Sequence, residues 1–190
     1  MLTAVEDALA RGSLELAGLP AAADGLAALR RARAAVAPEA PFTVAALGAW
    51  QAALTGGPGT FRREEMAREG GPPPAPARFV EARLQLLEQW IDQDTGRELK
   101  PAQVGALVLA RVIEVLPFAA ANGRVARLAT AHVMQRAGAR PPVLVGADEP
   151  RLRSALQAAF QLHTEPLCAL LDEASERALD ASIRALEGPR

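Results

Sequence analysis

Apolar residues recur along this chain at intervals of three and four, the spacing of one face of an α-helix. Alternating β-branched runs, which are typical of strands, are nearly absent. The pattern therefore predicts an all-α protein. The predicted helices cover residues 2–10 with a continuation through Leu16, 20–36, 44–54, 77–94, 101–115, 122–137, 149–162 and 164–186.

Residues with strong local preferences set the expected helix ends. Pro38 cannot continue the second helix because its ring removes the N–H and clashes with the preceding turn. Thr43 is placed to cap the third helix, and Pro101 suits the first turn of the fifth. Gly138 is placed as the left-handed residue that follows a helix.

The segment between the third and fourth helices differs from the rest of the chain. Residues 60–76 are first polar and then rich in Gly and Pro, with a proline run at 72–74. We predict a small β-hairpin flap here, on the surface of one compact domain. The chain then divides into N-terminal helices (1–40), a core (41–160) and a C-terminal helix packed on the core (161–190).

Charge and cysteine content exclude several classes of protein. The chain has 190 residues, 21 basic and 22 acidic, so no excess of positive charge favours nucleic acid or an anionic membrane. No apolar run approaches the roughly 18 residues that span a bilayer. Cys168 is the single cysteine, and Glu6 and Asp7 stand where a secretion signal would be basic and then apolar. We expect a cytoplasmic protein.

A short loop before the sixth predicted helix carries the candidate chemistry. Asn122 is expected to cap this helix, and Gly123 lets a ligand approach the backbone. Arg124 and Arg127 add positive charge on one face, next to N–H groups that lack helical partners. These features predict a site for a phosphate-type anion. The alternative is a capped helix with two arginines in ordinary ion pairs.

The residues around this loop suggest a family. Pro117-Phe118, three further residues and Asn122-Gly123-Arg124-x-x-Arg127 resemble the Fic (Fido-fold, Fic/DOC) signature, His-Pro-Phe-x-(Asp/Glu)-Gly-Asn-Gly-Arg-x-x-Arg. Gly57–Arg63 is similar to the segment that opens the family's flap hairpin, and the resemblance extends over about 41–160. It implies a Fic helical core and, in typical members, transfer of AMP from ATP to a protein hydroxyl.

The same resemblance implies which functions this chain lacks. In the family the motif His is the base, the motif acid binds Mg²⁺, and the Gly-Asn-Gly-Arg loop with the last Arg binds phosphates. Here Leu116 stands at the base position, Ala120 at the metal-ligand position and Ala121 at the first glycine. Leucine cannot accept a proton and alanine cannot bind a metal ion. The implied protein is a pseudoenzyme.

Phosphate-binding positions are retained, at Asn122, Gly123, Arg124 and Arg127, and Pro117 and Phe118 keep the structural part of the motif. We therefore expect a binding or regulatory module with no certain cofactor, at most binding ATP or another nucleotide weakly without Mg²⁺. The alternatives are a transferase of altered nucleotide or phosphate-donor chemistry and a scaffold protein.

Four further titratable candidates lie outside the motif. His132 and His163 are expected to be ordinary core or surface residues, and Glu114 to point away from the loop. Glu15 is a candidate for the Glu of the family's inhibitory helix, which pairs with the last motif Arg, and a solvated Glu is the alternative.

The expected partner is a protein. Phe61, Arg62 and Arg63 form the candidate flap, which in the family registers an extended target segment. For the flap arginines, including Arg68, a solvated segment is the alternative. Ala- and Leu-rich helices from Glu149 onward suit a homodimer or an internal core.

Overall fold

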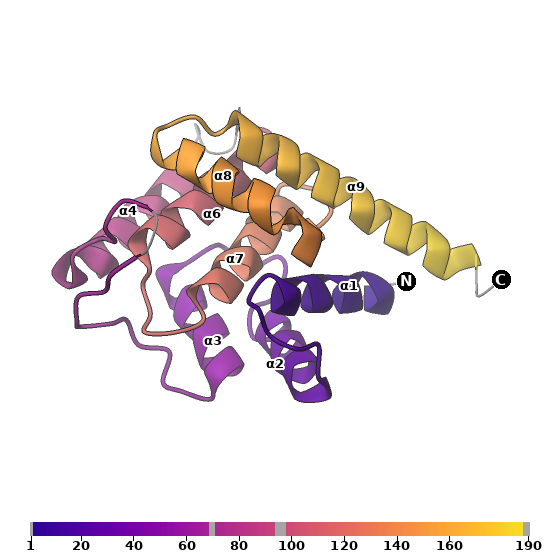
Figure 1. The fold of residues 1–190 in the computed structure, drawn as a ribbon, viewed down its shortest axis with the longest axis horizontal. Helices are drawn as coiled ribbons and strands as arrows, with labels where there is room; N and C mark the ends of the chain where they lie inside the picture. The colour runs from indigo at the N-terminus through magenta and orange to yellow at the C-terminus, as the bar shows by residue number, and fades with distance from the viewer. Residues whose placement is uncertain (1, 69–70, 94–97, 188–190) are drawn as a thin grey trace.

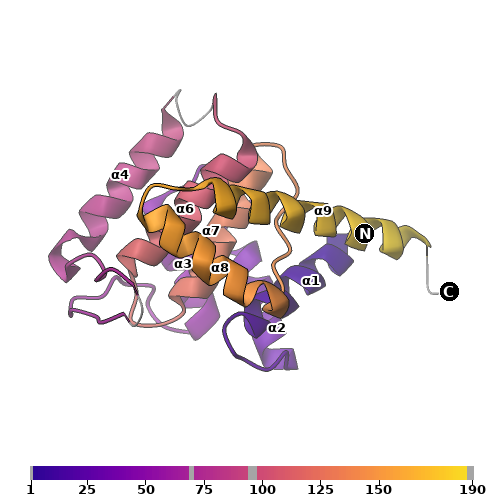
Figure 2. The same ribbon diagram turned by 45° about the horizontal axis from the view of Figure 1, so that its top comes forward.

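The computed structural model describes residues 2–68, 71–93 and 98–187. Helices account for most of this part of the chain (Figures 1 and 2). In chain order its elements are α1 (Leu2–Glu15), α2 (Ala23–Ala34), α3 (Val44–Thr55), the 3₁₀ turn η1 (Ala77–Phe79), α4 (Val80–Asp92), α6 (Pro101–Val115), α7 (Asn122–Arg136), the 3₁₀ turn η2 (Gly146–Asp148), α8 (Glu149–Phe160) and α9 (Glu165–Glu187).

Helices α6 and α7 pack against each other at the centre, and the other helices surround them (Figure 1). Helix α6 is apolar on most sides because it has neighbours on most sides: it contacts α4, α7, α8 and α9. One hydrophobic core runs from Ala10 in α1 to Ala174 in α9. Residues of the predicted N-terminal, central and C-terminal regions therefore share a single core.

Most of the predicted helices are confirmed, with boundaries shifted by a few residues. Helix α6 matches its prediction, and the Thr43 hydroxyl accepts the Ala46 N–H as an N-cap. Gly138 follows α7 with φ of +84°. Helix α1 continues without a break to Glu15, and α2 begins at Ala23, not at Pro20.

The predicted β-hairpin flap is wrong for the residues described. Residues 60–68 and 71–76 form an extended loop without a strand. The Arg62 N–H donates to the Pro117 carbonyl, 2.9 Å away, and the Arg62 side chain donates to four further carbonyls. Since prolines at 72–74 also lack N–H groups, the returning segment cannot form a regular ladder with the first.

Helix α1 approaches the backbone of the segment between α7 and α8 closely at Gly12. A Cβ at Gly12 would stand 1.7 Å from the Leu144 carbonyl oxygen, so only glycine fits there. The Glu15 carboxylate accepts the Gly146 N–H at the start of η2, 2.9 Å away. These contacts fix α1 against the segment between α7 and α8, over the N-terminal half of α7.

None of the described helices has the length and apolar composition that a membrane span requires.

Candidate anion site at the loop between α6 and α7

The loop at 116–121 connects the end of α6 to the start of α7, and its two ends differ. At the α6 end, four successive carbonyls at 113–116 lack partners within the helix or next to it. Arg68 donates to Ile113 and Glu114, and Arg62 donates to Val115 and to Leu116, the last at 2.7 Å. Two arginines of the extended loop thus satisfy the whole C-terminal end of α6.

The Arg62 side chain is 2% exposed, and its guanidinium also donates to the Glu64 and Ala75 carbonyls. The Arg68 guanidinium lies 5.0 Å from the centre of the Phe160 ring. The solvated-segment interpretation is therefore wrong for Arg62 and Arg68. It holds for Arg63, which is exposed. Arg62 is buried and Arg68 is partly buried because both donate to helix carbonyls that no local residue can reach.

Phe61 and Phe118 hold the loop from the apolar side. Their ring centres are 5.4 Å apart, and Phe118 is fully buried. The motif residues Pro117 and Phe118 thus lie where the sequence placed them, in contact with the flap segment.

Asn122 does not cap α7, which corrects the prediction. Its side-chain oxygen accepts the Phe118 N–H at 2.9 Å, and its amide donates back to the Phe118 carbonyl at 2.7 Å. Asn122 is already inside the helix, and the cap position is taken by Ala121. Asn122 therefore closes the loop on itself, and its side chain is not available to a ligand.

Ala121 adopts φ of +68°, a left-handed conformation that favours glycine. This conformation explains why the family motif has a glycine at this position. No side chain in the described part of the chain caps α7. The N–H groups of its first turn therefore lack a side-chain acceptor and can donate hydrogen bonds to an anion.

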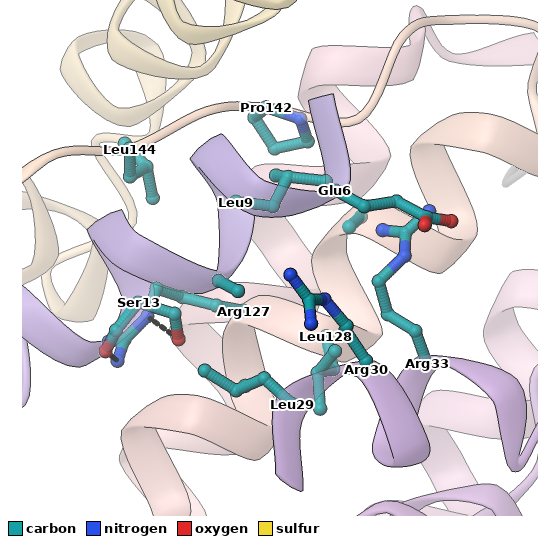
Figure 3. Close-up of a pocket in the computed structure, with 12 residues that line it drawn as sticks. Glu6, Leu9, Ser13, Leu29, Arg30, Arg33, Arg127, Leu128, Pro142 and Leu144 are labelled. Atoms are coloured by element: carbon teal, nitrogen blue, oxygen red, sulfur yellow. Dashed lines mark hydrogen bonds between the residues drawn. The ribbon is translucent and has the colours of Figure 1, made fainter. Parts of the chain in front are cut away.

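Two arginines of α7 stand beside these N–H groups. Arg124 is half-buried, and Arg127 lies one turn further on the same face. The Arg127 Nε and Nη2 donate to the hydroxyl and carbonyl of Ser13 in α1, at 3.1 and 2.7 Å (Figure 3). Its Nη1 lies 3.2 Å from the point where a Cβ of Gly123 would be, so Gly123 leaves room for this cation.

Burial and, to a smaller extent, the charge of Arg124 lower the pKa of Arg127 to about 10. Its hydrogen-bond partner, Ser13, is neutral, and the described residues give it no ion pair with a carboxylate. A buried cation beside a second cation is electrostatically unfavourable and would be stabilised by an anion.

Glu15, the candidate inhibitory residue, does not meet Arg127 in this structure. Its carboxylate bonds to the Gly146 N–H, and Ser13 takes the contact with Arg127. Two residues along a helix differ by about 200° in direction, so the two side chains point to different neighbours. No sequence signal pointed to Ser13, because a neutral hydroxyl does not stand out as the partner of an arginine as a carboxylate does.

On the α1 side, Arg127 borders a cavity of about 30 Å³ between α1, α2 and α7 (Figure 3). Arg30 and Arg33 also line it, and Glu6 faces them. Burial lowers the pKa of Arg33, and Glu6 opposes that shift. A cavity of this size holds about one water molecule, so a nucleotide would have to approach from the loop side.

Residues able to act as base or metal ligand do not gather at the loop. Leu116 ends α6 with φ of +46°, and Ala120 is exposed. His132 is buried, with its Nε2 2.9 Å from the Ala40 carbonyl, and burial lowers its pKa. His163 is exposed. Glu114 pairs with Arg83 and Arg111 on another face. No group of three His, Cys, Asp or Glu in the described chain fits a metal ion.

Similarity to known proteins agrees with this geometry. A model of the Fic/DOC family matches residues 41–134. The chain carries a Fic/DOC family domain. "Protein adenylyltransferase Fic" from Drosophila virilis and from Drosophila melanogaster are each 26% identical to it over 127 residues, which is 67% of this chain. The matched region spans about a quarter (26%) of those relatives' length.

Solved Fic structures share the fold. A Fic domain containing signaling protein from Bacteroides thetaiotaomicron aligns with a TM-score of 0.80 and 17% identity, covering 97% of this chain and 88% of that one. Fic-1 (residues 134–508) from C. elegans aligns with a TM-score of 0.76 and 17% identity, covering 95% of this chain and 64% of that one. At this identity the likeness concerns the fold alone.

Proposed function

We propose that this Fic domain is catalytically degenerate and acts as a binding or regulatory module that takes a phosphate-type anion at the start of α7. One observation carries the proposal most: Arg127 is a buried cation whose partner is neutral and whose neighbour is another cation. The uncapped N–H groups at 122–124 and the Arg124 side chain lie next to it.

Absence of AMP transfer is proposed from the residues at the two reacting positions. A leucine at 116 has no group to take the proton of an attacking hydroxyl, and loss of a positioned base costs about 10²–10⁴-fold in rate. An alanine at 120 leaves no ligand for the Mg²⁺ on which phosphoryl transfer in the family depends. The residues present do not fit this ion, so no step is assigned to it.

Anion binding is expected to be weak. Backbone N–H groups, Arg124 and the Arg127 Nη1 can hold a phosphate, but a triphosphate would lack its metal. We expect micromolar to millimolar dissociation constants, corresponding to about −8 to −4 kcal/mol.

Calorimetry tests this site with inorganic phosphate, pyrophosphate, ADP and ATP, each with and without Mg²⁺. Arg124→Ala should abolish measurable binding because its cation lies at the helix start. The matched control is Arg136→Ala, which removes an exposed arginine at the opposite end of α7, where the helix dipole repels anions. Absence of heat with every one of these anions would refute the anion site.

A labelling assay tests the chemistry separately. The protein is incubated with ATP labelled at the α-phosphate and with cell lysate, and the expected result is no labelled protein. The variant Leu116→His/Ala120→Asp/Ala121→Gly restores the family's residues and should bind ATP with Mg²⁺ more tightly than the wild type. Labelling by the wild type would show that transfer persists through another base.

A further inference from the structure

A groove at one end of the molecule has an apolar floor and basic groups on its wall. It lies between α4, α6 and the turn from α8 to α9, and it has a volume of about 710 Å³. Large apolar side chains of α4, α6 and α8 form its floor: Leu86, Leu87, Trp90, Leu107 and Phe160. Leu86 and Leu162 are 65% and 88% exposed. Leu162 also adopts φ of +69°, which places a large apolar side chain in solvent on a strained backbone.

The charge on the wall of this groove is positive. Arg83 and Arg111 share a single carboxylate, Glu114, and the side chains of both arginines remain 40% and 45% exposed. The Arg68 guanidinium lies 5.0 Å from the ring centre of Phe160, which lines the groove. No other acidic residue lines the groove in the described part of the chain. An occupant should therefore present apolar side chains and carboxylates.

The far end of α9 has these properties. In both ribbon views the last turns of α9 extend beyond the other helices, at the opposite end of the molecule from α4 (Figures 1 and 2). Leu179, Ile183 and Leu186 recur there at intervals of four and three and are 37%, 43% and 72% exposed. They form one apolar stripe on the helix.

Carboxylates line one edge of this stripe. Glu176, Asp180 and Glu187 fall within about 40° of each other around the helix, because residues are 100° apart. Two stripes packed antiparallel around a two-fold axis would bring these acidic edges together, and like charges would repel. The stripe is therefore poorly suited to its own copy and well suited to a basic groove.

We propose that the α9 stripe of one copy of this chain docks in the α4–α6–α8 groove of another. Arg83 and Arg111 then face Asp180 and Glu187, while the apolar stripe covers the groove floor. The two surfaces differ and lie at opposite ends of the molecule, so the contact is head-to-tail and can continue from copy to copy.

Sedimentation velocity of the purified chain over a range of concentrations tests the proposal. The wild type should associate beyond a dimer. Leu162→Asp disrupts the groove and Ile183→Asp disrupts the stripe, and each variant alone should associate at least tenfold more weakly than the wild type. Both residues are exposed, so the fold should be retained, as circular dichroism would check. Ala185→Asp is the control, since it changes an exposed residue of the same helix outside the stripe.

Mixing the two variants decides the mode of association. Each retains one intact surface, so an equimolar mixture should form a 1:1 dimer that does not grow. Reversing charge at Arg83 and Arg111 to Glu should weaken association, and adding Asp180→Arg/Glu187→Arg should restore it. A wild type that stays monomeric overturns the proposal. If association is unchanged by Leu162→Asp, the groove is not the docking site.

Discussion

The two ends of the loop at 116–121 differ in whether the terminal backbone groups of the adjoining helix have hydrogen-bond partners. At the α6 end, Arg62 and Arg68 reach from a distant segment and satisfy every terminal carbonyl. At the α7 end, no described side chain caps the helix, and Ala121 holds a conformation that alanine disfavours. Terminal groups that are already satisfied serve stability, whereas unsatisfied N–H groups beside cations are available to a ligand.

The arginines at these two ends therefore have different roles. The Arg62 guanidinium donates hydrogen bonds to backbone carbonyls that would otherwise be buried without a donor. Arg124 instead lowers the pKa of its neighbour Arg127, which is a repulsive interaction. Substitution of the two arginines should consequently change stability in opposite directions.

The largest expected effect is at Arg62. Arg62→Ala leaves several buried carbonyls without a donor, and we expect a loss of about 3–5 kcal/mol in the free energy of unfolding. Urea denaturation measures this. Arg63→Ala, the control, changes an exposed neighbour and should stay within about 0.5 kcal/mol. Equal effects of the two variants would contradict the proposed role of Arg62.

A smaller loss is expected at Arg68. Arg68→Ala removes donors to Ile113 and Glu114 and the contact with Phe160, and should cost about 1–3 kcal/mol. Arg78→Ala is a close control, because Arg78 also lies over a phenylalanine, 4.7 Å from the Phe79 ring centre, but is exposed. If both variants lose the same stability, the capping of α6 contributes nothing.

At the α7 end, a glycine should help. Ala121→Gly removes the strain of an alanine in the left-handed conformation. The free energy of unfolding should rise by about 0.5–1 kcal/mol, a net value from which the greater entropy of glycine in the unfolded chain has been subtracted. Ala119→Gly is the matched control, since Ala119 lies in the same loop without a positive φ and should lose stability. Thermal melts of the two variants should shift in opposite directions.

The smallest effect is expected at Arg124. Arg124→Gln removes the charge that opposes Arg127, so unfolding should become harder by about 0.5 kcal/mol without added anion. Excess phosphate should stabilise the wild type and leave this variant unchanged, because bound ligand favours the folded state. A clear loss of stability in phosphate-free buffer would show that Arg124 is a structural residue like Arg62.

The lowered pKa of Arg127 predicts how the free energy of unfolding depends on pH. Folding lowers its pKa from the ordinary arginine value to about 10, so above that pH the unfolded chain binds more protons than the folded one. The contribution of this residue to stability is therefore lowest below about pH 10 and rises as the pH increases above 10. Above pH 10 the neutral side chain also ceases to attract an anion.

Local sequence was sufficient for the helices. Proline at 101, threonine at 43 and glycine at 138 act on their own or adjacent backbone groups, so the ends of α6, α3 and α7 could be predicted from residues close in the chain. The flap could not be predicted in this way, because its hydrogen bonds leave the segment.

Sequence alone determined the helical fold, the position of the loop and the residue types that stand at the base and metal positions. Tertiary structure decided what the polar side chains do. Arg62 bonds to a carbonyl 54 residues away, and Arg127 to a serine 114 residues away. A guanidinium has five N–H donors and can bond to any acceptors that lie within reach in the folded chain. Because those acceptors belong to elements distant in the sequence, spacing along the chain cannot specify them.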